Sequence, residues 1–298
     1  MKHREWTRLV PAMVCALILF GLPACGDEET GQEAPPGCDT LFEGLNEGYM
    51  VNGIERSFYI DLPEGVEASW PWPVVFAWHG FGDSARNFRR LTEDLVDNEV
   101  MPFIAVTPEN TRMLLEWDIA DAANPENREV LLFDALLDEI DTCWGVDRDH
   151  VHSTGFSFGD GISAMLGVLR SDVIASIAGW SGVYGSNPAN DLPYIVADWP
   201  ELSPDNKYVE LRVHGGILDW FVMPFGTFGE NDRIYMNDNG HDYIDCRHNS
   251  IHNQGVRFMG AEHIIRFFAD HPYGTEDSPY ELGLPADYPD SCYLSQKN

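Results

Sequence analysis

The pattern G-x-S-x-G occurs in Ser153-Thr154-Gly155-Phe156-Ser157-Phe158-Gly159, after an apolar stretch and before a segment with helical periodicity. In that setting the serine lies on a sharp turn between a strand and a helix, which leaves its hydroxyl available to a substrate. We therefore predict that Ser157 is a catalytic nucleophile and that Gly155 and Gly159 let strand and helix approach the turn closely. Loops of this kind also contain glycine and serine without catalysis, so the prediction depends on a base, an acid and oxyanion donors elsewhere in the chain.

Strand patterns and helix patterns alternate along the chain around this motif. Residues 73–78 form a continuous apolar run, as expected of a strand buried on both faces of a parallel sheet, and residues 56–62 alternate in the manner of an edge strand. Because strands that alternate with helices form parallel sheets with crossover helices on both faces, we predict an α/β fold with a mostly parallel central sheet. Further strands are expected at residues 103–106, 150–154, 174–179, 209–214 and 243–246, and helices at residues 84–97, 129–143, 162–169 and 261–270.

A second glycine-rich turn, His79-Gly80-Phe81-Gly82, follows the strand expected at residues 73–78. Reacting groups gather at the carboxyl ends of parallel strands, so this turn is expected beside the nucleophile. We predict that the backbone N–H groups of Phe81 and of Phe158, the residue after the nucleophile, form an oxyanion hole. The alternative is a turn that only joins a strand to a helix.

Chain order and position after strands predict the other members of a serine triad. Asp219 follows an expected strand and lies between the nucleophile and the candidate histidines. Its role would be to accept the imidazole N–H and fix the tautomer of the base. Asp242 and Asp245 are weaker candidates because they fall before or within a strand. The loop after the next strand holds His248 and His252, and we choose His252 as the base, with His248 second.

The spacing of His248 and His252 is also that of a zinc-binding pair. However, the pattern H-E-x-x-H needs glutamate after the first histidine, and position 249 is asparagine. The following serine makes a helix here still less favourable. We therefore predict no metal site, and no cofactor, because acyl transfer through a serine needs neither.

Four motifs carry a resemblance to a known family: His79-Gly80-Phe81-Gly82-Asp83-Ser84-Ala85, residues 151–159, His214-Gly215 with Asp219, and Cys246-x-His248-x-x-x-His252. They resemble those of exported esterases of the polyhydroxybutyrate depolymerase, feruloyl esterase and acetylxylan esterase type, in the α/β-hydrolase superfamily. The likeness extends from about residue 45 to residue 272. It implies the α/β-hydrolase fold, with helices on both faces of the sheet, and it implies that the second histidine of the last motif is catalytic.

Two positions depart from the pattern of that family. Phe158 stands where a small residue is usual, and Asn249-Ser250-Ile251 stands where glycines are usual. We expect Phe158 to narrow the acyl pocket and Ile251 to alter how His252 is presented.

The resemblance implies a secreted serine esterase that hydrolyses carboxylic esters through a Ser-His-Asp triad and an acyl-enzyme. It suggests feruloyl or acetyl groups on polysaccharide, or a polyhydroxyalkanoate-type polyester, as the substrate, which would then be polymeric. Trp180 and Trp220 are candidate walls of the substrate pocket, with core packing as the alternative for each. Two other functions stay open: a serine peptidase of related fold, and a non-catalytic surface lipoprotein that binds polysaccharide.

The N-terminus has the features of a secretory signal peptide. Basic residues precede an apolar run, residues 9–22, that is too short to span a bilayer comfortably. The run ends in Leu22-Pro23-Ala24-Cys25, which looks like a bacterial lipobox, so we predict lipidation of Cys25 and membrane contact only through that anchor. An ordinary signal peptide is the alternative. The predicted division is a lipoprotein signal peptide at residues 1–24, an acidic Gly/Pro/Glu tether at residues 25–37 and a catalytic domain at residues 38–298.

The cysteine content suggests disulfides if the protein is exported, as its N-terminus predicts. Four cysteines fall in the predicted catalytic domain, without a C-x-x-C pair, which favours two disulfides over a zinc or redox site. Three pairings are possible and all remain open. The four residues are Cys38, Cys143, Cys246 and Cys292.

The chain is strongly acidic, with a formal net charge of −31 at pH 7 and only three lysines. A chain with this charge repels polyphosphates, so we predict no nucleic-acid partner. The composition fits a protein from a salty habitat and an ordinary acidic exported enzyme equally well. It leaves the oligomeric state open.

Overall fold

The computed structural model describes residues 40–66, 71–111, 117–182, 199–203, 206–221 and 223–298. The predicted signal peptide, Cys25 and the tether lie outside these residues, as does Cys38. None of the described helices combines the length and the apolar character needed to cross a membrane.

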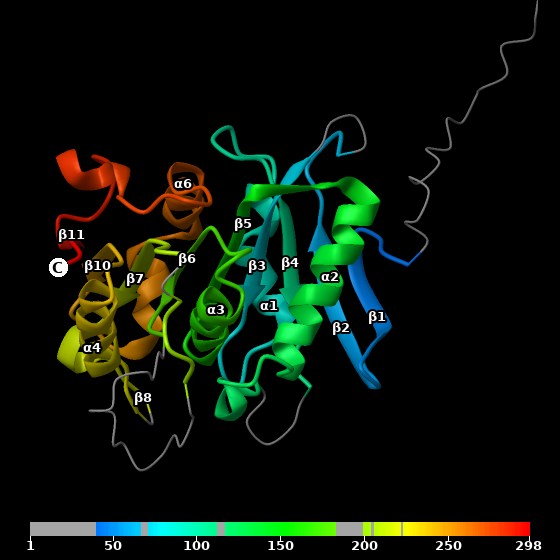
Figure 1. Ribbon diagram of the computed structural model, residues 1–298, viewed down its shortest axis with the longest axis horizontal. Coiled ribbons are helices and arrows are strands. Elements are labelled where there is room, and N and C mark those ends of the chain that lie inside the picture. Colours follow the sequence, from blue (N-terminus) through cyan, green and yellow to red (C-terminus); the bar gives the residue numbers. More distant parts are fainter. Residues whose placement is uncertain (1–39, 67–70, 112–116, 183–198, 204–205, 222) are drawn as a thin grey trace, which may run out of the picture. The chain divides into compact units, whose positions relative to one another are not determined.

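A nine-stranded sheet runs through the described residues (Figure 1), in the order β1-β2-β4-β3-β5-β6-β7-β10-β11. The six neighbouring strands from β4 to β10 are parallel, and antiparallel strands lie at both ends of the sheet. This confirms the predicted α/β fold with a mostly parallel sheet. The strands are β1 (Gly44–Val51), β2 (Ile54–Asp61), β3 (Trp72–Trp78), β4 (Ile104–Pro108), β5 (Val146–Phe156), β6 (Ser176–Trp180), β7 (Glu210–His214), β10 (Tyr243–Arg247) and β11 (Cys292–Ser295).

Helices cover both faces of the sheet (Figure 1). Strand β3 shows why: Val74 and Phe76 pack in one core cluster with apolar residues of α2 and α3, while Val75 and Ala77 pack in a second cluster with residues of α6. A strand buried on both faces therefore needs the continuous apolar run that its sequence has. The helices are α1 (Ala85–Phe88), α2 (Arg128–Trp144), α3 (Phe158–Leu169), α4 (Phe225–Asp238), α5 (Gly255–Phe258) and α6 (Ala261–Asp270).

Short elements connect these parts and carry much of the site. They are the 3₁₀ turns η1 (Arg89–Leu91), η2 (Glu93–Leu95), η3 (Ile119–Asp121), η4 (Gly216–Leu218), η5 (His252–Gln254) and η6 (Pro279–Leu282), and the two-stranded pair β8 (Trp220–Phe221) and β9 (Met223–Pro224).

Two predicted elements differ in the structure. The strand predicted as an edge is β2, which lies between β1 and β4 and pairs with both in antiparallel fashion. Its sequence alternates because Phe58 and Ile60 face the core, whereas Tyr59 between them is only partly buried. The helix predicted at residues 84–97 breaks into α1, η1 and η2. Ser84 does cap its start by accepting the Asn87 N–H, but Arg89 then turns to bond Asp61 of β2 at 2.7 and 2.9 Å. Thr92 also bonds the Arg89 carbonyl at 3.1 Å, and local side-chain bonds of this kind compete with a continuous helix.

Candidate active site

Ser157 lies on the turn between β5 and α3. Its φ of 56° is in the left-handed region, which is strained for a residue other than glycine. The turn is held by a hydrogen bond of 2.8 Å from the Ser157 N–H to the Trp180 carbonyl. The flanking glycines are required by close packing, because a β-carbon on Gly155 would lie 2.4 Å from Gly159 C and one on Gly159 would lie 2.1 Å from Trp78 O. The expected crowding of strand and helix is confirmed.

Replacing Gly159 with alanine is expected to destabilise the protein by about 3 kcal/mol or more, because the new methyl group meets backbone rather than a movable side chain. Gly274→Ala is the matched control: a β-carbon there meets nothing within 4 Å and only the positive φ of 82° is strained. Thermal unfolding of both variants measures the difference. Equal losses in the two would contradict the close packing at Gly159.

His252 joins Ser157 to an aspartate. Its Nε2 lies 2.9 Å from Ser157 Oγ, and its Nδ1 lies 2.7 Å from Asp219 Oδ1. Asp219 follows β7 through η4, and His252 follows β10 at the start of η5, so all three groups stand beyond the carboxyl ends of parallel strands. The three residues are buried, with exposed fractions of 3, 1 and 7 % for Ser157, Asp219 and His252. The structure therefore brings together the three residues that the sequence selects.

The second carboxylate oxygen of Asp219 also accepts hydrogen bonds. This atom, Oδ2, accepts a hydrogen bond of 2.7 Å from the Ser181 hydroxyl and one of 2.9 Å from the Gly215 N–H. Burial favours the neutral acid, but these bonds and the bond to His252 outweigh burial and hold the pKa of Asp219 below its ordinary value. The carboxylate is thus ionised and faces the ring nitrogen that carries a proton.

Ser181 is a site residue that the sequence interpretation missed. It directly follows β6, the strand next to β5, and its φ is 51°. A small hydroxyl residue at that strand end was the available signal. Because its hydroxyl donates to the acid, it adds to the orientation of Asp219 rather than to the reaction itself.

The turn after β3 lies beside Ser157, since Phe81 and Ser157 line one cavity. His79 is fully buried and fixes this turn: its Nδ1 donates to Gly80 O at 2.9 Å, and its Nε2 lies 3.1 Å from Glu109 Oε1. Burial raises the pKa of Glu109, but the hydrogen bond and charge of His79 outweigh it, so the pKa of Glu109 lies below its ordinary value. Phe158 is the first residue of α3, so its N–H has no carbonyl one turn earlier to bond.

The cavity in front of Ser157 has a volume of about 340 Å³ and largely apolar walls. Trp220 is 63 % exposed and Phe221 49 % exposed, so both present aromatic surface to an incoming molecule. Phe225 and Phe221 also stack on the ring of His252, at centroid distances of 4.1 and 5.7 Å. The lining residues are Phe81, Phe156, Ser157, Trp220, Phe221, Ile251, His252 and Asn253.

Trp180, the other predicted pocket wall, lies in the core instead. It is 1 % exposed, belongs to the core cluster on the α6 face and donates its indole N–H to Met259 O at 2.8 Å. The reason is its position on β6, where a side chain packs under a helix rather than facing the cavity. Phe158 is half-buried and meets Phe81 edge-on at 6.1 Å, so the large residue after the serine is accommodated by aromatic packing.

The remaining candidates have other surroundings. His248 packs against Phe258, and burial lowers its pKa; within the described part of the chain its ring nitrogens have no hydrogen-bond partner. Asp242 accepts the backbone N–H groups of Ser278 and Lys297, at 2.9 and 3.1 Å. The described residues contain no group of three or more His, Cys, Asp or Glu arranged to hold a metal ion.

Comparison with known proteins gives relatives in sequence and in fold. No protein-family model matches the chain. Feruloyl esterase D of Neurospora crassa is 28 % identical over 264 residues, which are 82 % of this chain and 89 % of that protein. The probable feruloyl esterase C of Aspergillus terreus is 24 % identical over 249 residues, 79 % and 83 % of the two chains.

Solved structures agree on the fold. The native structure of pOPH matches with a TM-score of 0.68 and 16 % identity, over 89 % of this chain and 98 % of that one. The CE1 ferulic acid esterase of Anaeromyces mucronatus, in complex with ferulic acid, matches with a TM-score of 0.55 and 18 % identity, over 85 % and 97 %. The chain is an esterase with the α/β-hydrolase fold. The predicted fold and the predicted class, a carboxylic ester hydrolase, are therefore confirmed.

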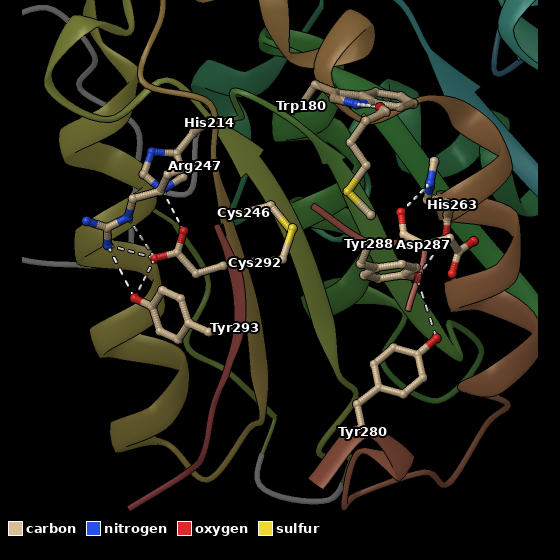
Figure 2. The surroundings of a disulfide bond; sticks show 12 residues. Trp180, His214, Cys246, Arg247, His263, Tyr280, Asp287, Tyr288, Cys292 and Tyr293 are labelled. Carbon is tan, nitrogen blue, oxygen red and sulfur yellow. Dashed lines mark hydrogen bonds and ion pairs between the residues drawn. A yellow bond between two sulfur atoms is a disulfide. The ribbon is translucent and has the colours of Figure 1, made fainter. Parts of the chain in front are cut away.

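A disulfide joins the two strands at one edge of the sheet. Cys246 of β10 is bonded to Cys292 of β11, which lies directly opposite in the antiparallel pairing (Figure 2). Of the pairings left open by the sequence, this one joins the strand that leads to His252 with the last strand of the chain. Cys143 is disulfide-bonded too.

Proposed function

We propose that the protein is a secreted serine esterase that works through Ser157, His252 and Asp219. The observation that carries the proposal is the pair of hydrogen bonds, 2.9 and 2.7 Å long, that joins the serine hydroxyl to the carboxylate through the two nitrogens of one imidazole. A serine hydroxyl is a weak nucleophile until a base accepts its proton, and this arrangement supplies the base and fixes its tautomer.

The proposed reaction has two acyl-transfer steps. In the first, His252 Nε2 takes the proton of Ser157 as Oγ attacks the ester carbonyl, and the N–H groups of Phe81 and Phe158 receive the oxyanion. His252 then gives the proton to the leaving alcohol as the ester C–O bond breaks. In the second, water attacks the acyl-enzyme with His252 again as base, and the carboxylic acid leaves from Ser157. No cofactor enters these steps.

The substrate we favour is an ester of an aromatic acid such as ferulate, joined to a polysaccharide. The aromatic walls of the cavity support this choice, because flat rings bind well between Trp and Phe side chains. The feruloyl esterases among the relatives support it as well. Acetyl-polysaccharide and polyhydroxyalkanoate-type polyesters are the other substrate classes to be compared.

Trp220→Ala is expected to raise KM for methyl ferulate by about tenfold while leaving p-nitrophenyl acetate hydrolysis within about twofold, because only the larger acid reaches the aromatic wall. Steady-state kinetics on the two esters measure the split. Leu282→Ala is the control, since Leu282 is fully exposed on η6 and is not among the residues that line the cavity. An equal change on both esters would count against an aromatic acyl site at Trp220.

Covalent labelling tests the serine directly. The purified protein is incubated with a fluorophosphonate, and the modified peptide is identified by mass spectrometry. We expect labelling at Ser157, competition by methyl ferulate, and no labelling of the Ser157→Ala or His252→Ala variants. Labelling at another serine, or ester hydrolysis without labelling, would refute the proposed site. Turnover of peptide anilides at rates similar to those of esters would favour a peptidase.

Export is part of the same proposal. The disulfide between Cys246 and Cys292 fits an oxidising compartment. The predicted signal peptide at residues 1–24 would deliver the chain there, and lipidation of Cys25 would hold it at the cell envelope. Mass spectrometry of the N-terminus of the mature protein tests the cleavage site and the lipid together.

A further inference from the structure

A second buried histidine–aspartate pair lies behind the acid of the proposed triad. His214 Nε2 lies 2.8 Å from Asp245 Oδ1, and the two side chains are 1 % and 0 % exposed. His214 is the last residue of β7, where the chain leaves the strand toward Asp219. Asp245 is on β10, two residues before that strand ends and leads to the loop of His252. The pair thus stands at the base of both loops.

His214 bonds to each of these loops. Its Nδ1 accepts the Gly216 N–H at 3.2 Å, so the proton of the ring is on Nε2, which donates to Asp245. Its carbonyl accepts the His248 N–H at 3.0 Å. His214 therefore joins two loops. One is the acid loop, residues 215–219, which carries Asp219, and the other is the base loop, residues 248–252, which carries His252.

The acid loop depends on such support because it begins with two glycines. Gly216 has a φ of 60°, and the Asp219 N–H bonds the Gly216 carbonyl at 2.9 Å. The Gly215 N–H in turn donates to the carboxylate of Asp219 at 2.9 Å. A β-carbon on Gly215 would lie only 1.9 Å from Ser250 O, so the two loops pack backbone against backbone. A small displacement of Gly215 or Gly216 would therefore move the carboxylate of Asp219.

The last strand of the chain fixes Asp245. The Tyr293 hydroxyl donates to Asp245 Oδ2 at 2.8 Å, and Arg247 donates to the same oxygen from Nη2 at 2.7 Å and from Nε at 3.1 Å. Tyr293 follows Cys292 of the disulfide, and Figure 2 shows His214, Arg247 and Tyr293 gathered on one side of that bond. Burial opposes ionisation, but these partners and His214 lower the pKa of Asp245 to about 2. Asp245 is therefore a carboxylate anion in a fixed position. Because a carboxylate only accepts hydrogen bonds, it favours the tautomer of His214 that carries its proton on Nε2.

We propose that His214 and Asp245, with Tyr293 of β11, are positioning residues that set the acid loop so that Asp219 Oδ1 faces His252. The inference rests on the proposed triad and adds a role for the C-terminal strand, which would otherwise only close the sheet edge. None of the three residues touches the cavity, so they act through Asp219 and not on the substrate.

Variants at position 214 test this role. His214→Ala is expected to lower kcat for p-nitrophenyl acetate by about 100-fold with KM within about twofold, because displacement of a catalytic group by about 1 Å costs a factor of this size. The kcat of His214→Asn is expected to be about tenfold higher than that of His214→Ala, because the amide oxygen can occupy the place of Nδ1 and accept the Gly216 N–H. Tyr293→Phe should lower kcat by about threefold to tenfold, whereas Tyr273→Phe, at an exposed tyrosine, should leave it unchanged.

A proton NMR measurement separates positioning from general destabilisation. The wild type should show a low-field resonance of the proton between His252 and Asp219, and Asp219→Ala identifies it by its loss. In His214→Ala, measured well below its unfolding temperature, this resonance should be shifted or broadened. In His214→Asn the resonance should be partly restored. A His214→Ala variant with wild-type kcat and resonance, while Ser157→Ala is inactive, would overturn the positioning role and leave the triad intact. Activity retained in Ser157→Ala would overturn both.

Discussion

Ser157→Ala is expected to lower kcat for ester hydrolysis by about 10⁴-fold or more, because no acyl-enzyme can form once the hydroxyl is removed. The remaining acceleration over uncatalysed hydrolysis in water would come from the oxyanion donors and from substrate binding alone. KM should change little, since the alanine fits the turn and the walls of the cavity remain. The rate is measured with p-nitrophenyl acetate and methyl ferulate, with circular dichroism to establish that the variant folds.

A matched control is available on α3, the helix that follows Ser157. Ser163 of α3 is fully buried, and its hydroxyl accepts a hydrogen bond of 2.9 Å from Ser153. Ser163→Ala therefore removes a buried hydroxyl from the same helix without contact with His252, and its kcat should stay within about threefold of the wild type. A Ser157→Ala variant that loses less than about tenfold would rule out covalent catalysis through this serine.

The strands and the order of the site residues could be predicted because both follow simple rules. Fully buried parallel strands need unbroken apolar runs, as in β3, and catalytic groups follow such strands in the chain. Chain order and position do not distinguish His248 from His252, because both lie in the loop after β10 and only four positions separate them. The family resemblance supported His252, and the path that the loop takes depends on contacts that the sequence does not display. Asn249 has a φ of 50°, and the His248 N–H is bonded to His214 O. The ring of His248 packs against Phe258, whereas the ring of His252 bonds Ser157.

Helix α4 was missed for a related reason. Its sequence contains Gly226 and Gly229, and no strong apolar periodicity marks it as a helix. The structure shows what it packs against: a β-carbon on Gly226 would lie 1.7 Å from Gly216 O, and Phe225 stacks on His252. Gly226, which weakens the helix locally, is here required by the close approach of α4 to Gly216. Tertiary packing, and not local propensity, specifies this element.

Asp219→Asn is expected to lower kcat by about 10⁴-fold at neutral pH with little loss of stability. The Ser181 hydroxyl and the Gly215 N–H both donate to Oδ2, so the amide of asparagine will keep its oxygen toward them and turn its NH₂ group toward His252. Imidazole Nδ1 must then accept a hydrogen bond, which places the ring proton on Nε2, where it faces Ser157. In that tautomer His252 cannot take the serine proton.

The surroundings of Asp219 therefore make this substitution a test of tautomer control and not only of charge. Asp94→Asn, at an exposed aspartate of η2, removes the same charge from the surface and should leave kcat unchanged. Rates on p-nitrophenyl acetate and the low-field proton resonance of His252 are measured for both variants. The resonance should disappear in Asp219→Asn and persist in Asp94→Asn. If Asp219→Asn retained more than about a tenth of the wild-type kcat, the carboxylate would not be the group that orients His252, and the histidine would have to be held in its reactive tautomer by other contacts.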